Sequence, residues 1–191
     1  ALSSAASDVY KRQGYTLTLE GIGVDEAFIT LYATITGEEP IPNWGGEEET
    51  GPAVWPLNLR AEGRELEAWG AQTEWERLDS HAIKLTQRCP VMTVLPAVVE
   101  LEVYTDQLVP RVRGNWSLDL LVDKTAPDGE SLVAEPNQTF TVDGQRITVE
   151  KVAVAPSGGG LVLSTKSDRP FTHFIPVSYT HLRAHETLRH L

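Results

Sequence analysis

The sequence predicts an all-β fold, with an antiparallel immunoglobulin-like β-sandwich followed by a second, truncated β-sandwich unit. Short segments in which apolar and polar residues alternate recur along the chain. Turn signals rich in Gly, Pro and Asp separate these segments, and helical periodicity is almost absent. The single cysteine, Cys89, excludes the paired cysteines of an antibody-type domain.

The clearest predicted element is a β-hairpin centred on Asp143-Gly144. Apolar and polar residues alternate from Thr139 to Asp143 and again from Arg146 to Glu150. Asp-Gly favours a type I′ turn, because both central residues of that turn need a positive φ. The alternation breaks at Glu150-Lys151, which predicts a β-bulge.

Other strands are expected on both sides of this hairpin. They are Tyr15 to Ile22, Ala27 to Thr36, Ala82 to Gln87, Val98 to Tyr104, Asn115 to Asp123 and Leu161 to Thr165, with a further hairpin around Glu62-Gly63 and a glycine-rich turn at residues 156–160. Residues 38–56, rich in Pro, Gly and Glu, predict a long exposed loop. Residues 67–78 fit either a strand edge or a short helical turn.

Composition divides the chain into five parts. Residues 14–124 form the sandwich domain, 125–136 a linker, and 137–176 an incomplete second β domain with too few strands to close a sandwich. Residues 1–13 and 177–191 are expected to be non-native extensions. Their segments DVYKRQ and SYTHLRAHET resemble translated adapter or vector sequence, so they are set aside in predicting the fold.

Charge and hydropathy exclude several classes of protein. The net charge is −11, whereas nucleic-acid binding requires clustered Lys and Arg, so we expect no nucleic-acid partner. No apolar run approaches the roughly 18 residues of a membrane-spanning helix, so we expect no transmembrane segment in this fragment. One cysteine permits no intrachain disulfide, and Cys89 is expected to be a buried structural thiol.

No pattern of catalytic residues emerges. Serine-hydrolase and phosphate-binding glycine motifs are absent. Glu74 and Glu76 flank Trp75, and Glu100 and Glu102 share a strand face, which is the pairing that glycosidases use. Solvated strand faces produce the same pairs in any acidic protein. We therefore expect no enzymatic activity and assign no catalytic or cofactor-binding residue.

A cluster of histidines near the end of the chain suggests a metal site at first sight. His181 and His185 are four residues apart, as on one face of a helix, and His190 follows. The order of residues does not match His-Glu-x-x-His, and no cysteine pair is present to complete a zinc finger. We assign no metal ligand.

Four tryptophans crowd into residues 44–75. They are Trp44, Trp55, Trp69 and Trp75. If exposed, their rings would form a possible patch for a ligand or a partner, by stacking on sugars or by contacting protein. Packing into the core beneath the long loop would also explain them, and it is the interpretation we prefer from the sequence.

Three segments carry a family resemblance. GYTLTLEGIGVDEAFITLYATITG, GNWSLDLLVD and NQTFTVDGQRITVEKVAVAPSGGGLVL resemble the extracytoplasmic region of bacterial anti-sigma-factor-like membrane proteins. That region consists of paired domains of unknown function with β-sandwich folds. The acidic loop at residues 38–56 and the early end of the second domain depart from the pattern.

The resemblance implies a function and a location. The chain would be a non-enzymatic sensor or scaffold region outside the cytoplasm, anchored through a transmembrane helix upstream of this sequence. It would contact an extracytoplasmic ligand or protein, and a sigma factor would bind only through a missing upstream segment. The alternative from the residues is a cell-surface carbohydrate-binding or adhesion module that uses the tryptophans.

Overall fold

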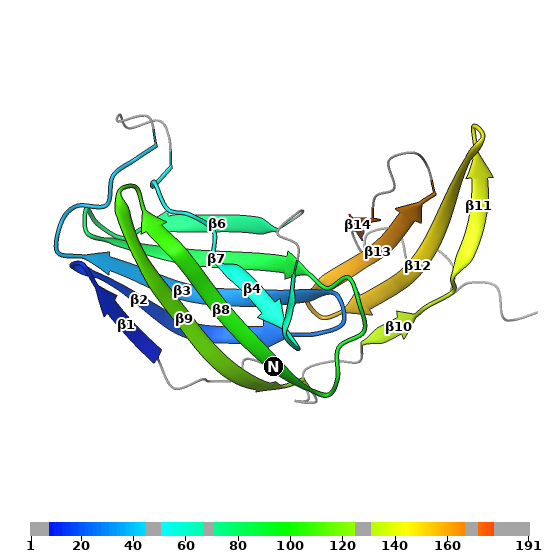
Figure 1. Ribbon diagram of the computed structural model, residues 1–191, viewed down its shortest axis with the longest axis horizontal. Helices are drawn as coiled ribbons and strands as arrows, with labels where there is room; N and C mark the ends of the chain where they lie inside the picture. The colour runs from blue at the N-terminus through cyan, green and yellow to red at the C-terminus, as the bar shows by residue number, and fades with distance from the viewer. Residues whose placement is uncertain (1–7, 45–50, 67–70, 125–130, 167–171, 178–191) are drawn as a thin grey trace, which may run out of the picture. The chain divides into compact units, whose positions relative to one another are not determined.

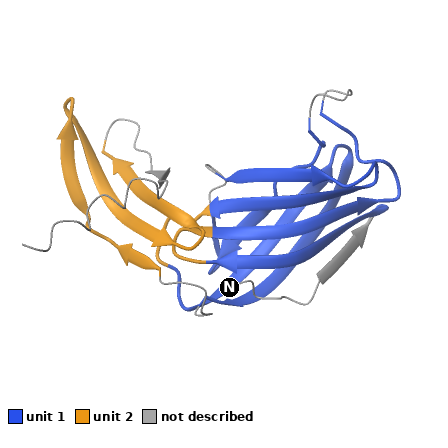
Figure 2. Ribbon diagram, turned by 180° about the vertical axis from the view of Figure 1, so that it is seen from behind, with its two compact units in different colours: residues 1–24, 29–89, 95–126 blue, residues 25–28, 90–94, 127–191 orange. Residues whose placement is uncertain are grey.

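The all-β prediction is confirmed by a computed structural model that describes residues 8–44, 51–66, 71–124, 131–166 and 172–177. These residues form antiparallel sheets and no helix, so the described chain has no helix long and apolar enough to cross a membrane. The chain divides into two compact units (Figure 2). Unit 1 contains residues 1–24, 29–89 and 95–126, and unit 2 contains residues 25–28, 90–94 and 127–191.

Unit 1 is a β-sandwich whose two sheets lie face to face (Figure 1). The first sheet has the order β1-β2-β3-β7-β6, with bounds Asp8–Arg12, Tyr15–Val24, Phe28–Gly37, Ala82–Pro90 and Gln72–Arg77. The second sheet has the order β5-β4-β8-β9, with bounds Arg64–Glu65, Asn58–Ala61, Val98–Val109 and Val112–Asp123. Side chains that alternate along each strand fill the space between the sheets; Leu17 and Leu19 of β2 and Leu101 and Val103 of β8 are buried.

The predicted strands of unit 1 appear at their expected positions, and several extend further. The ambiguous segment at residues 67–78 contains a strand, β6. The hairpin at Glu62-Gly63 is confirmed, with φ of 50° and 72° as a type I′ turn requires. Residues 8–12, which composition placed in an extension, pair with β2 through a second turn of this kind at Gln13-Gly14.

The long segment at residues 38–56 is less exposed than its composition predicts. In its described parts, Ile41, Ala53 and Val54 are buried. Backbone hydrogen bonds hold it, including Ala53 N to Pro42 O at 2.8 Å. Proline and glutamate dominated the composition, but the few apolar residues at each end of the segment bury themselves in the sandwich.

Unit 2 is built on one sheet of five strands. Its order is β10-β12-β13-β14, with bounds Leu132–Ala134, Gln145–Ala155, Gly158–Thr165 and Thr172–Val177, and β11 (Gln138–Val142) also pairs with β12. The predicted hairpin is confirmed, with Asp143 and Gly144 at φ of 49° and 79°. The bulge is confirmed by a register shift between Val149 and Lys151. The strand β10 lies inside the range expected to be a linker.

One turn is placed differently from the prediction. Residues 158–160 belong to β13 rather than to a glycine-rich turn, and Gly159 and Gly160 pair with Val154 and Ala153. The turn itself contains Pro156 and Ser157. Three glycines in a row suggested a loop because glycine weakens strands, but pairing with β12 overrides that preference.

A buried lysine, Lys151, connects β12 to two other segments of unit 2. Lys151 is only 1% exposed, and its ammonium donates hydrogen bonds to the backbone oxygens of Glu26 (2.8 Å), Val91 (2.9 Å) and Thr93 (3.0 Å). Around it lies a small apolar core made of Ala27, Phe28, Ala153, Ala155 and Val162, with Met92 packed against it. Three carbonyl acceptors match the three donors of an ammonium group and offset the cost of burying the charge.

Candidate functional site

Two of the tryptophans that the sequence singled out, Trp44 and Trp55, meet in unit 1. The rings of Trp44 and Trp55 meet edge to face, with centroids 5.1 Å apart and planes at 86°. This is a favoured arrangement for aromatic pairs, because the positive edge of one ring meets the negative face of the other. An antiparallel bridge between Asn43 and Pro52 brings the backbone near Trp44 and the backbone near Trp55 together.

Trp75 reaches the same place from the edge strand β6. It lies opposite the buried Leu85 of β7, so its side chain is on the inner face of the sheet at its open edge. A Cβ atom on Gly51 would lie 2.3 Å from the Trp75 indole nitrogen, which means that the indole rests directly on the Gly51 backbone. Gly51 O also accepts a hydrogen bond from Trp44 N at 3.1 Å.

Hydrogen bonds hold the backbone around these rings in one conformation. Arg77, also on β6, donates through Nη2 to Asn43 Oδ1 (2.6 Å) and to Ile41 O (3.1 Å). Trp55 N donates to Leu108 O of β8 at 3.1 Å. Rings held in this way lose little conformational freedom when a ligand binds.

We call Trp44, Trp55 and Trp75 the tryptophan surface. Trp55 is 43% exposed and Trp75 is 39% exposed, while Trp44 is half-buried. Trp69, the fourth member of the predicted patch, lies outside the described residues. The fifth tryptophan, Trp116, is 1% exposed in the core of unit 1. The crowding of tryptophans in the sequence predicted this surface. Nothing in the sequence indicated that Gly51 and Arg77 hold it in place.

A second feature is a hollow on the outer face of the β4-β8-β9 sheet. Its volume is about 440 Å³, and its lining includes Arg60, Glu100, Glu102, Asp119 and Leu121. Glu100 and Glu102 are the pair that the sequence had singled out. Register explains the grouping, because Arg60 lies opposite Glu102, Glu102 opposite Asp119, and Glu100 opposite Leu121.

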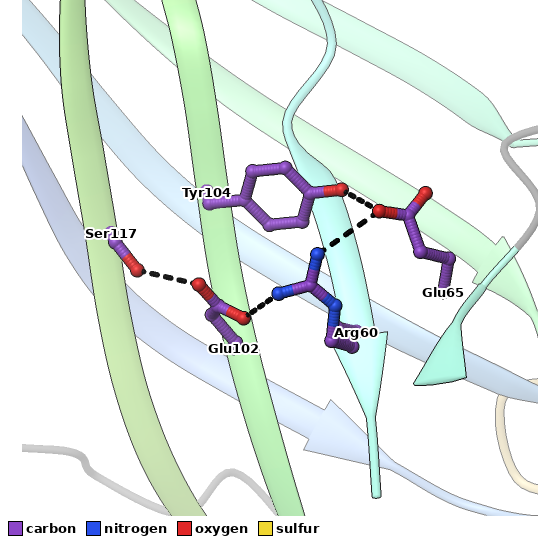
Figure 3. Close-up of polar contacts among 5 residues, drawn as sticks. All are labelled: Arg60, Glu65, Glu102, Tyr104 and Ser117. Atoms are coloured by element: carbon purple, nitrogen blue, oxygen red, sulfur yellow. Dashed lines mark hydrogen bonds and ion pairs between the residues drawn. The ribbon is translucent and has the colours of Figure 1, made fainter. Parts of the chain in front are cut away.

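The one cation in the lining of the hollow is held by its neighbours (Figure 3). Arg60 pairs with Glu102 through Nη1 and with Glu65 through Nη2, at 3.1 Å for the latter, and lies over the Tyr104 ring at 4.9 Å. Ser117 Oγ donates to the other carboxylate oxygen of Glu102 at 2.9 Å. An arginine committed to two carboxylates has little capacity to bind an anionic ligand.

The network shifts the proton affinities of its members. The hydrogen bond from the Tyr104 hydroxyl and then that from Arg60 lower the pKa of Glu65. The same hydrogen bond raises the pKa of Tyr104, because it stabilises the protonated phenol. Hydrogen bonding to Glu65 raises the pKa of Arg60. The shifts of Arg60 and Glu65 favour the charged forms of both side chains, and so favour the ion pair between them.

The paired acids of β6, the single cysteine and the histidines are the other candidate residues from the sequence. Glu74 and Glu76 alternate with Trp75 on β6, so they point to the opposite face of the sheet. Cys89 is buried, and desolvation raises the pKa of its thiol, which makes it a poor nucleophile. No group of three His, Cys, Asp or Glu suited to a metal occurs in the described part of the chain, and His181, His185 and His190 lie outside it.

Comparison with known proteins shows a likeness of fold. No family model and no curated protein matches the chain. It is similar to the crystal structure of the conserved domain protein from Bacillus anthracis, with a TM-score of 0.55 and 12% sequence identity. The match covers 86% of this chain and 55% of that one, so this chain spans about half the length of its structural neighbour. At this identity the likeness concerns the fold alone.

Proposed function

We propose that this chain is a non-enzymatic sensor or scaffold region and that it contacts its ligand or partner through the tryptophan surface. The observation that carries the proposal is the grouping of three tryptophans, two of them about 40% exposed. The Trp44 and Trp55 rings meet edge to face, and the Trp75 indole rests on Gly51, whose oxygen binds Trp44 N. Aromatic side chains dominate the binding energy of protein interfaces, especially when they are rigid and partly sheltered. The polar network around Arg60, by contrast, is internally satisfied.

The proposal extends to the cellular context of the chain. Its segments 14–37, 114–123 and 137–163 resemble the extracytoplasmic part of anti-sigma-factor-like membrane proteins. On that basis the region lies outside the cytoplasm, follows a membrane anchor, and belongs to a regulator of sigma-factor activity. The resemblance is the support for this context, and the sandwich fold agrees with it.

The native gene is the direct test of this context. Sequence encoding a transmembrane helix upstream of residue 14, beside a sigma-factor gene, is the expected result. A hydrolase domain in that position, or a gene without any membrane anchor, would overturn the proposal. Binding between the upstream cytoplasmic segment and the neighbouring sigma factor, measured by calorimetry, then tests the regulatory role itself.

The tryptophan surface also favours a second candidate function, a carbohydrate-binding or adhesion module. Exposed indole faces stack on the apolar faces of sugar rings. The chain carries a net charge of −11, so a neutral glycan would approach it more readily than an acidic one. The two candidates differ in whether the ligand is a glycan and in what the rest of the polypeptide contains.

Glycan binding distinguishes the second candidate. Trp55→Ala and Trp75→Ala are expected to weaken binding to a neutral oligosaccharide about tenfold, whereas Trp44→Ala, which removes the support of Trp55, has a smaller effect. Tyr32→Ala is the matched control, since Tyr32 is also 39% exposed but lies on β3. A glycan array without signal, or equal binding by all four variants, eliminates the carbohydrate module and leaves the regulator proposal standing.

A further inference from the structure

The strand β6 forms one edge of the first sheet of unit 1 (Figure 1). Among the described strands it pairs with β7 alone, in an unbroken antiparallel register from Gln72 to Arg77. Alternate residues of such a strand direct their backbone N–H and C=O groups away from the sheet, where another extended chain can bind them. Thr73 is half-buried, and the other five residues of β6 are exposed. The strand therefore presents a straight, exposed edge.

The other edge strands of unit 1 lack this combination of features. β5 has only two residues, and β1 and β9 contact each other. β6 is also the edge strand that carries a member of the tryptophan surface, Trp75. An extended chain that pairs with β6 would therefore lie beside that surface.

The inner side of β6 is suited to an apolar side chain. Trp75 lies on this side, opposite the buried Leu85, and its indole rests on the Gly51 backbone. Arg77, the next residue on this side, is held by its hydrogen bond to Asn43 Oδ1. A residue of an added strand directly opposite Trp75 would have its side chain on the same side as the indole and within reach of it.

The outer side of β6 is suited to basic side chains. Glu74 and Glu76 are exposed on this side, and Glu76 lies opposite Lys84 of β7. Opposite charges in directly opposed positions of neighbouring strands stabilise the pairing, whereas like charges destabilise it. A strand added beyond β6 would therefore pair best with Lys or Arg opposite the two glutamates.

A second copy of this chain does not meet these requirements. Antiparallel pairing of two β6 strands about Trp75 would bring Glu74 of each copy opposite Glu76 of the other. Pairing centred on either glutamate would bring that glutamate opposite itself. Because like charges in opposed positions destabilise a sheet, the charge of β6 favours a basic partner over a second copy.

We infer that β6 is a docking edge for an extended segment of a protein partner. In that segment an apolar residue opposite Trp75 lies between two basic residues opposite Glu74 and Glu76. Peptides that add a strand to a sheet edge gain affinity from main-chain hydrogen bonds and specificity from alternate side chains. The inference rests on the proposed contact role of the tryptophan surface and names a polypeptide as the partner. The net charge of −11 also favours the approach of a basic segment.

A synthetic peptide, acetyl-Gly-Thr-Lys-Val-Lys-Thr-Gly-amide, tests the docking edge. Titrated into the full chain, it is expected to shift the β6 amide resonances and the Trp75 indole N–H resonance, and to slow exchange of the β6 amides. Two further peptides carry N-methyl groups, one at both lysines and one at the valine. Because only alternate residues direct N–H groups to β6, one of these is expected to bind about tenfold more weakly and the other nearly normally. Equal binding of all three peptides would overturn the inference.

Charge variants separate recognition by β6 from attraction to net charge. A peptide with glutamates in place of both lysines is expected to bind the natural chain about tenfold more weakly than the lysine peptide. Glu74→Lys/Glu76→Lys is expected to reverse this preference. Glu100→Lys/Asp119→Lys makes the same change in net charge on the other sheet and is expected to keep the preference. Reversal in both double variants would contradict the docking edge.

The two sets of resonances distinguish this inference from the proposed function. Indole shifts without shifts of the β6 amides would overturn the docking edge and leave the contact role of the tryptophan surface standing. Shifts of the β6 amides alone would support the docking edge and contradict the contact role of the indoles. A lysine peptide that shifts neither set would also overturn the inference.

Discussion

The side chain of Gln87 makes both hydrogen bonds of a peptide group with the backbone of Leu57. Its Oε1 accepts from Leu57 N at 2.8 Å, and its Nε2 donates to Leu57 O at 2.6 Å. Gln87 is fully buried on β7, while Leu57 directly precedes β4, so the pair joins the two sheets of unit 1. The Gln87 side chain thus gives the Leu57 backbone the two hydrogen bonds that a neighbouring strand would otherwise supply.

Replacing Gln87 by leucine is therefore expected to destabilise unit 1 by about 3 kcal/mol. The substitution leaves a buried N–H and a buried C=O without partners, and each costs about 1–3 kcal/mol. Every tryptophan of the chain belongs to unit 1, so denaturant unfolding followed by tryptophan fluorescence reports on this unit. Gln72→Leu, at an exposed position on β6, is the control and should change stability by less than about 0.5 kcal/mol. Equal stability of the two variants would contradict the structural role of Gln87.

Replacing Lys151 is expected to destabilise unit 2, even when the new side chain has a similar length. Lys151→Met keeps the volume but leaves three buried backbone oxygens without this donor, and we expect a loss of about 3 kcal/mol or more. Lys151→Arg is expected to rescue little, because a planar guanidinium cannot direct its donors toward carbonyls arranged around an ammonium. Hydrogen exchange of the β12 amides measures the effect within unit 2. Lys166→Met, at an exposed position, is the control.

Glu65 is expected to titrate below an ordinary glutamate, and Tyr104→Phe should move its pKa back toward the usual value. The Tyr104 hydrogen bond is the largest cause of the lowered pKa, and Arg60 contributes next. Because the folded pKa is lower than the unfolded one, the resulting stability is present above the unfolded pKa and disappears as pH falls through the folded pKa. Carboxyl carbon shifts in NMR titrations check the direction. The effect on stability should be small, since Glu65 is mostly exposed.

Period-two alternation predicted most of the fold. It located β2, β3, β7, β8 and β9, because each has one face toward a core and one toward solvent. It also located the β11-β12 hairpin, where the Asp-Gly turn added to the signal although β11 is exposed throughout. It failed where tertiary pairing overrides local preference. Residues 158–160 form a strand despite three glycines, and β10 is a short edge strand within a segment whose composition resembles a linker.

The candidate site was less accessible to sequence reasoning. Crowding of tryptophans at residues 44–75 indicated a patch, but which rings meet depends on a loop closed by hydrogen bonds. The partner of Arg77 is Asn43, many positions earlier, and no sequence pattern indicates that contact. The burial of Lys151 was equally hidden, since a lysine beside a glutamate in a strand normally indicates a solvent-facing position.

The contact between Gly51 and Trp75 provides a way to disturb the tryptophan surface without removing a ring. Gly51→Ala places a methyl group where the Trp75 indole nitrogen now lies, at 2.3 Å, so the indole or the loop must move. We expect a shifted Trp75 indole N–H resonance, altered fluorescence and a lower melting temperature. Gly23→Ala is the matched control, because a Cβ at Gly23 meets no atom within 4 Å. If Gly51→Ala and Gly23→Ala leave the indole resonances equally unchanged, Trp75 does not rest on Gly51, and the three indoles do not form one surface.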